Sequence, residues 1–548
     1  MIPTSETTPV RLRRALGWRT ARVRRRLDTA LRRGERYLVR SGVMIDHLTI
    51  WADGPTPYLT VAATALGGMD GDLVQLTLGG CPLIPTAERG VWSAPLVHNP
   101  TWAGAAQPLE LGWLRIKATI DGEPVRVRAT CRPSVVTGGV RLLLDAQPSL
   151  LSGSRARMQV LAPQTDECRT AEERDAVVTE VMAAPHELID TVYLETSLGR
   201  AAGYAADNPG AVAEYLSQCH PELPLVWGCR DGAALAQVPA GQRGVLIGSR
   251  EWAEAITAAR WIVVSDWLDP RIVKREGQRV LQTWHGTMYK TIGLSRSNCT
   301  DEQAAAARAQ AAQWDLLLSQ NPHSSEVLRT AYEWEHPLEA GYPRNDRLAR
   351  GEVDREAARA RLGLRPGQTA VLYAPTWRDA ELDQSAVASP EELADQLGKD
   401  YVVLARGHNR TNHHALSHPR VIDVTRHPDL LELFVASDVL LTDYSSMMFD
   451  FALTGRPMVF LVPDLEEYET IRGTHFDLAA EAPGPVVRTL DEAVTALRDH
   501  DVLADSAAAV AAWRRRWLPW DDGHAAERAV QALLELPVDA TSEHPVAA

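Results

Sequence analysis

The chain has 548 residues and a formal net charge of −14, with 45% hydrophobic and 23% charged residues. This length exceeds what one hydrophobic core supports, so we expect two or three folded domains. The acidic balance argues against nucleic acid as a partner, because such ligands need basic surface on the folded domains. Six dispersed cysteines without a C-x-x-C pair indicate neither a disulfide framework nor a zinc site.

Residues 11–40 are strongly basic, with twelve Arg against Asp28 and Glu35, a local charge of +10 that leaves about −24 for the rest. Apolar residues recur there at three- and four-residue steps, which predicts an amphipathic helix within residues 1–43. Such a helix suits an anionic membrane surface; packing on the protein itself or on a partner is the alternative. Since the N-terminus has no apolar signal-peptide core and no run of eighteen apolar residues occurs, we expect a cytoplasmic protein, peripheral on the inner face of the plasma membrane.

The rest of the chain shows two kinds of sequence pattern. Residues 44–165 consist of short alternating runs broken by Gly and Pro, which predicts a β-rich, antiparallel N-terminal domain whose role the sequence does not indicate. Strand and helix patterns then alternate through residues 186–340 and again through 341–535. This alternation predicts an α/β fold with two Rossmann-like domains, whose ligands bind at the carboxyl ends of the strands. Residues 536–548 are expected to be a disordered tail.

Polar residues cluster at these expected strand ends. In DVLLTDYSSMMFDFA, a strand at Val439 to Leu441 leads into a helix that Ser445 or Ser446 can cap, and the free N–H groups of its first turn suit a phosphate. Arginines follow other strands in EAGYPRND, YAPTWRD and VLARGH, namely Arg344, Arg378 and Arg406. A serine at a helix start is usually a cap without a ligand, and one such arginine is more often part of a surface ion pair. Together they predict a diphosphate ligand.

Several longer segments resemble one family. QTWHGTMYKTIG, AGYPRNDRL, VLYAPTWRD, LARGH and the block beginning SDVLLTDYSSMMFDFALTGRP occur in the order and spacing of the CDP-glycerol glycerophosphotransferases, the teichoic-acid primases and polymerases, over roughly residues 190–480. The resemblance implies a GT-B fold, in which two Rossmann-like domains flank a cleft. It further implies transfer of a polyol phosphate from CDP-glycerol or CDP-ribitol to a hydroxyl of a lipid-linked acceptor, with release of CMP and without a cofactor. Whether the protein forms a homo-oligomer stays open.

The resemblance also implies roles for particular residues. His285, in the H-G-T motif, is the expected catalytic base, and His408, in the R-x-H motif, the second catalytic histidine; Arg406, His408 and the amides at Ser445 and Ser446 are expected to hold the phosphoryl oxygens. The expected substrate-binding residues are Trp284, Gly286, Thr287, Met288, Lys290, Arg344, Pro375, Thr376, Arg378, Arg406, Gly407, Asp443, Ser445, Ser446, Asp450 and Arg472. For His285 the structural alternative is a packed histidine at a strand end.

Two departures from the family pattern bear on the acceptor. Met288 and Tyr289 follow the H-G-T motif where the family usually has proline, and RGTHFD, with Thr474 and His475, replaces an aromatic-rich segment. No metal site is expected. Although His414 and His418 have the i, i+4 spacing of zinc ligands, no adjacent Glu or Cys completes a site, and magnesium at Asp443 and Asp450 is not required by the family resemblance.

Two other functions remain as alternatives. A GT-B glycosyltransferase would use a nucleotide-sugar in a similar cleft, and a non-catalytic scaffold would bind an anionic polymer at the membrane. The sequence leaves open whether the polyol is glycerol or ribitol, whether one unit or many are added, and what the acceptor is.

Overall fold

The structure is a computed structural model. It describes residues 42–53, 56–66, 73–78, 81–95, 97–98, 107–108, 112–125, 127–129, 134–137, 140–145, 157–161, 168, 170–185, 187–196, 207–376, 388–407 and 418–535. The basic segment, the C-terminal tail, Arg378, His408, His413 and His414 lie outside these residues. The chain divides into two compact units, Met1–Leu96 with Gly112–Leu161, and Val97–Leu111 with Ala162–Ala548.

The first unit is built from mostly antiparallel strands. One sheet has the order β11 (Val127–Ala129), β1 (Gly42–Asp53), β2 (Thr56–Leu66), β6 (Val91–Pro95) and β5 (Ile84–Pro85), with β1 and β11 parallel. The other has the order β12 (Ser134–Thr137), β13 (Val140–Asp145), β14 (Arg157–Leu161), β9 (Gly112–Ile120), β3 (Val74–Leu78) and β4 (Cys81–Pro82), with β10 (Glu123–Val125) on β9. In β3, Val74, Leu76 and Leu78 are buried while Gln75 is exposed, the alternation expected of a strand with one core face.

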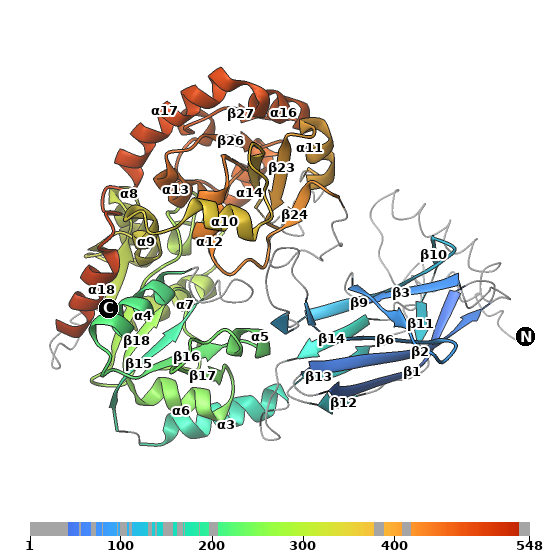
Figure 1. The fold of residues 1–548 in the computed structure, drawn as a ribbon. Helices are drawn as coiled ribbons and strands as arrows, with labels where there is room; N and C mark the ends of the chain where they lie inside the picture. The colour runs from blue at the N-terminus through green and yellow to red at the C-terminus, as the bar shows by residue number, and fades with distance from the viewer. Residues whose placement is uncertain are drawn as a thin grey trace, which may run out of the picture. The chain divides into compact units, whose positions relative to one another are not determined.

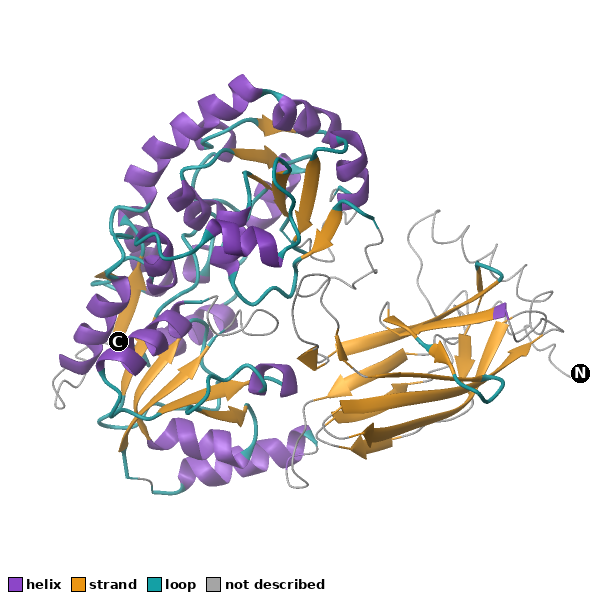
Figure 2. Ribbon diagram, viewed as in Figure 1, coloured by secondary structure: helices purple, strands orange, loops and turns teal. Residues whose placement is uncertain are grey.

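The second unit contains two parallel sheets, and the first of them forms what we call the first lobe (Figure 1). Its strand order is β17 (Arg243–Leu246), β16 (Leu225–Cys229), β15 (Ile189–Glu195), β18 (Ala259–Val264), β19 (Arg279–Gln282), β20 (Leu316–Ser319) and β21 (Leu338–Glu339). Its helices are α3 (Ala171–Ala183), α4 (Asn208–Cys219), α5 (Gly232–Leu235), α6 (Arg250–Ala258), α7 (Asp301–Ala311) and α8 (Pro322–Tyr332). Figure 2 shows them packed around the sheet.

The second sheet and its helices form the second lobe. The strand order is β24 (Val421–Asp423), β23 (Tyr401–Ala405), β22 (Thr369–Ala374), β25 (Val439–Thr442), β26 (Met458–Leu461) and β27 (Val486–Val487). The helices are α10 (Arg355–Arg361), α11 (Pro390–Leu397), α12 (Leu430–Ala436), α13 (Met447–Phe451), α14 (Leu465–Arg472), α15 (Leu478–Glu481), α16 (Leu490–Arg498) and α17 (His500–Trp517). The predicted α/β fold with parallel sheets is confirmed, and in both sheets the strand order reverses beside the earliest strand, as in doubly wound folds.

The chain crosses between the lobes twice. The first crossing holds the short helices η5 (Pro343–Asn345) and α9 (Asp346–Ala349), and the second follows α17 and leads to α18 (Ala525–Glu535). Although α18 closes the range 341–535 that the sequence assigned to one domain, its Ala529, Val530 and Leu533 are buried in the core of the first lobe. The carboxylate of Asp346 accepts the first N–H groups of α18, from Ala525 and Ala526, so the two crossings are bonded to each other.

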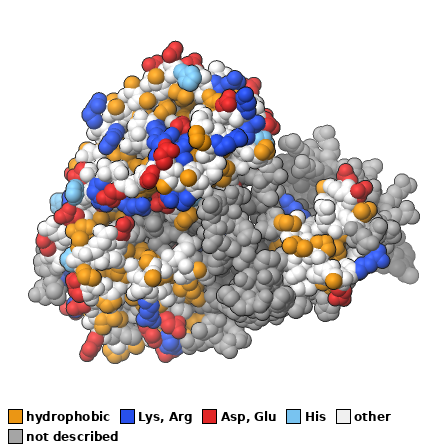
Figure 3. Space-filling view, viewed as in Figure 1, with side chains coloured by type: hydrophobic (Ala, Val, Ile, Leu, Met, Phe, Trp, Pro, Cys, Tyr) orange, Lys and Arg blue, Asp and Glu red, His pale blue; other side chains and the backbone are white. Residues whose placement is uncertain are grey.

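On the surface of the second lobe, basic and acidic side chains lie beside each other (Figure 3). Arg361 pairs with Glu432, and both Arg355 and Arg359 pair with Asp438. These arginines are therefore part of the lobe's own ion pairs. Within the described residues, no helix is long and apolar enough to span a bilayer.

Leu328 tests the packing of the first lobe. Its side chain on α8 is fully buried in the core, whereas Val273 in the same lobe is 63% exposed. We expect Leu328→Ala to lower the free energy of unfolding by about 2–5 kcal/mol, because it leaves a cavity, and Val273→Ala to change it by less than about 0.5 kcal/mol. Urea titrations followed by circular dichroism measure both; equal effects would contradict the described core.

Candidate active site

A cavity of about 430 Å³ lies where the carboxyl ends of the two sheets of the second unit meet. Its walls come from the segments that follow β19 in the first lobe and β22, β23 and β25 in the second. Ligands of doubly wound folds bind outside the carboxyl ends of the strands, where neighbouring connections diverge. The cavity therefore lies where the sequence places the ligand.

The segment after β19 makes an unusual turn. Trp284 has a φ of +55°, in the left-handed region that residues other than glycine seldom adopt. The side chain of Gln282 accepts the N–H of Trp284 at 2.9 Å, and the amide of Asn208 donates to the carbonyls of Thr283 and Trp284 at 3.2 and 2.9 Å. These bonds hold the strained turn that carries His285, and the Trp284 ring stacks on the imidazole with centroids 5.1 Å apart.

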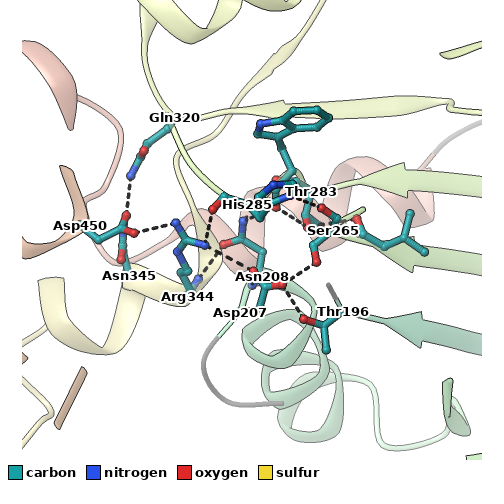
Figure 4. Close-up of polar contacts among 12 residues, drawn as sticks. Thr196, Asp207, Asn208, Ser265, Thr283, His285, Gln320, Arg344, Asn345 and Asp450 are labelled. Carbon is teal, nitrogen blue, oxygen red and sulfur yellow. Dashed lines mark hydrogen bonds and ion pairs between the residues drawn. The ribbon is translucent and has the colours of Figure 1, made fainter. Parts of the chain in front are cut away.

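The ring of His285 is held through its Nδ1. Its Nδ1 lies 2.6 Å from the backbone carbonyl of Ser265, at the end of β18 (Figure 4). Because a carbonyl can only accept, Nδ1 carries the hydrogen, and Nε2 of the neutral ring has its lone pair available. A histidine that lines a cavity in this tautomer is suited to take a proton from a bound hydroxyl.

Arg344 connects the two lobes behind His285. Its Nη2 lies 2.6 Å from Oδ2 of Asp450, while its Nη1 lies 3.4 Å from Oδ1 of Asp207 and 2.9 Å from the carbonyl of His285. Burial opposes the charge, but the two carboxylates outweigh it and raise the pKa of Arg344. The guanidinium that the sequence assigned to a phosphate is thus already bound by protein groups.

Asp450 is held from both sides as well. Its Oδ1 accepts the side-chain amides of Gln320, from the first lobe, at 3.1 Å and of Asn345 at 2.8 Å. Gln320 in turn accepts the hydroxyl of Thr287. These contacts tie the H-G-T loop to α13 of the second lobe.

The loops after β19 and β25 approach each other closely at Gly286. A Cβ at this position would lie 2.6 Å from Oγ and 2.9 Å from Cβ of Ser446. Ser446 precedes the first residue of α13 without a side-chain capping bond, and Ser445 Oγ accepts the N–H of Met447 at 3.3 Å. Only glycine fits opposite Ser446.

Arg406, after β23, differs from Arg344 in its partners. Its Nη1 donates to the carbonyl of Val424 at 3.1 Å, and no carboxylate in the described part of the chain forms an ion pair with it. Burial lowers the pKa of Arg406 to about 10, with Asp423 acting in the opposite direction. The guanidinium therefore stays charged at neutral pH and has donors to spare for an anion in the cavity.

The two segments that depart from the family pattern lie side by side. Thr291 donates its N–H to the carbonyl of Gly473 at 3.1 Å, and His475 donates its N–H to that of Tyr289 at 2.7 Å. Lys290 and Thr474 form a bridge between them. The RGTHFD segment is thus bonded to residues 289–291, which directly follow the H-G-T motif.

Most of the residues proposed from the sequence line this cavity. They are Trp284, His285, Gly286, Thr287, Met288, Lys290, Arg344, Pro375, Thr376, Arg406, Gly407, Ser445, Ser446 and Asp450. Asp443 lies behind the wall and accepts the N–H groups of Thr376 and Tyr444, and Arg472 ends α14, where its carbonyl accepts the hydroxyl of Thr291. His408 and Arg378 lie outside the described residues.

Sequence reasoning missed the residues that hold His285 from behind. Asp207, Asn208 and Ser265 are buried: Asn208 bonds the turn before His285, Ser265 bonds the ring, and Asp207 bonds Ser265. Asn208 and Pro209 begin α4, where Asp207 is the N-cap, but nothing local in the sequence ties them to residue 285.

A comparison with known protein families shows to which family the chain belongs. The model of the CDP-Glycerol:Poly(glycerophosphate) glycerophosphotransferase family matches residues 190–535. This chain belongs to that family. It is accordingly a transferase, as the sequence predicted.

Relatives within the family carry teichoic-acid names. The chain is 32% identical over 368 residues to a teichoic acid glycerol-phosphate transferase of Staphylococcus aureus, covering 63% of this chain and 92% of that protein. It is 33% identical to a teichoic acid poly(glycerol phosphate) polymerase of Bacillus subtilis, covering 53% of this chain and 42% of that protein. A solved structure of the wall teichoic acid polymerase TagF is 27% identical, with a TM-score of 0.60 over 68% of this chain and 95% of that one.

The close approach at Gly286 predicts that this glycerophosphotransferase-family enzyme does not tolerate a side chain there. We expect Gly286→Ala to lower CMP release from CDP-glycerol roughly 10- to 100-fold, because the two loops must move apart. Replacing Ser446 by glycine in the same protein should restore part of the rate. Gly232→Ala is the matched control, since a Cβ there meets nothing within 4 Å; wild-type turnover in Gly286→Ala would contradict the approach.

His475 makes stability depend on pH. Burial, followed by the charge of His323, lowers the pKa of His475 to about 4, whereas an unfolded histidine titrates near pH 6.5. Between these values the unfolded chain binds a proton that the folded chain does not, so stability falls as the pH falls from about 6.5 to about 4. His475→Phe should reduce this loss. Melting temperatures measured across this range, with His500→Phe on the surface as control, test the effect; unchanged slopes would contradict it.

Proposed function

We propose that the enzyme transfers glycerol phosphate from CDP-glycerol to a hydroxyl of a lipid-linked acceptor or growing teichoic-acid-like polymer and releases CMP. The observation that carries this proposal is the position of His285 at the cavity wall, with its ring fixed through Nδ1 and with no hydrogen bond to Nε2 among the described residues. The membership of the family and the names of the relatives support the donor and the reaction class.

The two lobes are proposed to form a GT-B arrangement. CDP would bind on the second lobe, at the carboxyl ends of β22 and β25 where its strand order reverses, and the acceptor on the first lobe beside His285. Supporting this, the cavity wall combines His285 from the first lobe with Pro375, Thr376 and Ser445 from the second.

In the proposed reaction, the acceptor oxygen attacks the β-phosphorus of CDP-glycerol. His285 Nε2 takes the hydroxyl proton as the new O–P bond forms, which typically contributes about 10²–10⁴ in rate. The P–O bond to CMP breaks, and CMP leaves with the negative charge. Arg406 and the backbone N–H groups around Ser445 and Ser446 stabilise the charge on the phosphoryl oxygens, with His408 and Arg378 as further proposed contacts.

Glycerol is favoured over ribitol by the comparisons. The glycerol-phosphate relatives are 32% and 33% identical to this chain, against 28% for a teichoic acid ribitol-phosphate primase of Bacillus spizizenii. A nucleotide-sugar donor is the alternative, and it predicts UDP rather than CMP as product. Product analysis with CDP-glycerol, CDP-ribitol and UDP-sugars against a panel of lipid-linked acceptors tests the assignment, and CMP release with none of them would overturn it.

Association with the membrane rests on the sequence of residues 11–40. This segment holds twelve arginines, and each arginine close to an anionic membrane surface contributes roughly 1 kcal/mol of binding free energy. We therefore propose a peripheral position at the inner face of the membrane, where a lipid-linked acceptor is presented.

His285→Ala separates catalysis from binding. We expect CMP release to fall at least about 100-fold while CDP affinity stays within a few-fold, because a base acts on the nucleophile in the transition state and not on the bound nucleotide. Rates of CMP release and calorimetry with CDP measure the two effects. An active His285→Ala protein would favour the non-catalytic scaffold.

Arg406→Ala is the variant to compare with His285→Ala, because we expect it to lower the affinity for CDP. Because its guanidinium has no carboxylate partner in the described part of the chain, its loss should weaken CDP binding itself. If His285→Ala lost CDP affinity as Arg406→Ala does, His285 would be a nucleotide-binding residue and not the base.

A further inference from the structure

Asp207 is a buried carboxylate with four polar partners in the first lobe and at the crossing. Its side chain is fully buried. Oδ2 accepts the hydroxyls of Thr196 and Ser265, each at 2.5 Å; Oδ1 accepts the N–H of Asn208 at 2.8 Å and lies 3.4 Å from Nη1 of Arg344. Figure 4 shows it below His285 without direct contact to the ring.

Two of these partners continue to His285. Ser265 bonds Asp207 through its hydroxyl and His285 Nδ1 through its carbonyl, so the carboxylate fixes the residue that fixes the ring. Arg344 bonds Asp207 and, through the same Nη1, the backbone carbonyl of His285. Asp207 is therefore linked through one intervening residue to the imidazole of His285 and through another to the backbone of His285.

Thr196 provides a contrast within the same site. Its hydroxyl donates to the same carboxylate oxygen as that of Ser265, but no described hydrogen bond of Thr196 leads to His285. A role of Asp207 that is confined to stability would use both hydroxyls alike. Of the two hydroxyls, only that of Ser265 would matter for a role in holding the base.

We propose that Asp207 is a positioning residue for the base: through Ser265 and Arg344 it holds His285 in the tautomer and orientation that leave Nε2 facing the cavity. The inference rests on the proposed function of His285. It follows the general pattern in which a base is oriented by a third group hydrogen-bonded behind it. Here the orienting carboxylate acts through a serine carbonyl and an arginine, not by direct contact.

The test compares Ser265→Ala with Thr196→Val, each of which removes one hydroxyl from Oδ2 of Asp207. We expect Ser265→Ala to lower kcat at least about 10-fold with KM for CDP-glycerol within about twofold, because the base contributes to the transition state and not to donor binding. Thr196→Val should leave kcat within about twofold. Melting temperatures of both variants show whether each is folded at the assay temperature.

A spectroscopic readout makes the test independent of turnover. In ¹⁵N spectra of histidine-labelled enzyme, assigned with His285→Ala, the wild type should show a protonated Nδ1 and an unprotonated Nε2 for His285. Ser265→Ala should shift this population toward the other tautomer or average it, and Thr196→Val should leave it unchanged.

The outcomes separate this inference from the proposed function. Equal losses of kcat in the two variants, or an unchanged His285 spectrum in folded Ser265→Ala, would overturn the positioning role. A wild type that releases no CMP while Ser265→Ala alone alters the His285 spectrum would overturn the proposed function and leave the positioning role standing.

Discussion

The site depends on one buried cation between two buried anions. Arg344 lies between Asp207 in the first lobe and Asp450 in the second, and its side chain is only 5% exposed. Taking such charges out of water is costly, and the cost is recovered only while every partner is in place; loss of one partner typically costs about 3–5 kcal/mol. The array therefore specifies one relative placement of the H-G-T loop and α13, because any other would leave a buried charge unpaired.

Arg344 and Arg406 both follow strands, but their surroundings give them different roles. Arg344 is neutralised by protein carboxylates and bonds the backbone of His285, whereas Arg406 is partly buried and, within the part of the chain that the structure describes, bonds one carbonyl, that of Val424. A positive group that is desolvated without a counter-ion gains most from an anionic ligand. In the sequence both arginines simply follow an expected strand. Only their tertiary partners show that Arg344 is bound by protein carboxylates while Arg406 has donors available for an anion.

Local chemistry made much of the fold predictable. Asp207 with Asn208-Pro209 specifies the start of α4, and the alternating strand and helix patterns specify two parallel sheets. The candidate site could be located because its motifs end strands, and the carboxyl ends of parallel strands share one edge. What could not be predicted depends on residues far apart in sequence: Arg344 bonds partners 137 and 106 positions away, and Ser265 reaches His285 over twenty. Likewise the apolar residues of α18 do not by themselves indicate which lobe they cover, and only packing shows that it is the first.

The paired crossings between the lobes constrain how the enzyme can move. Asp521 in the second crossing accepts the N–H of Tyr342 and the side-chain amide of Asn345 in the first, so the two connections run side by side and are cross-linked. Two lobes joined by one connection can twist freely, but two lobes joined by a pair of bonded connections bend chiefly about the line through both. Any movement of one lobe against the other would then follow a single hinge axis, and the same two surfaces would meet again whenever Arg344 and Asp450 pair again.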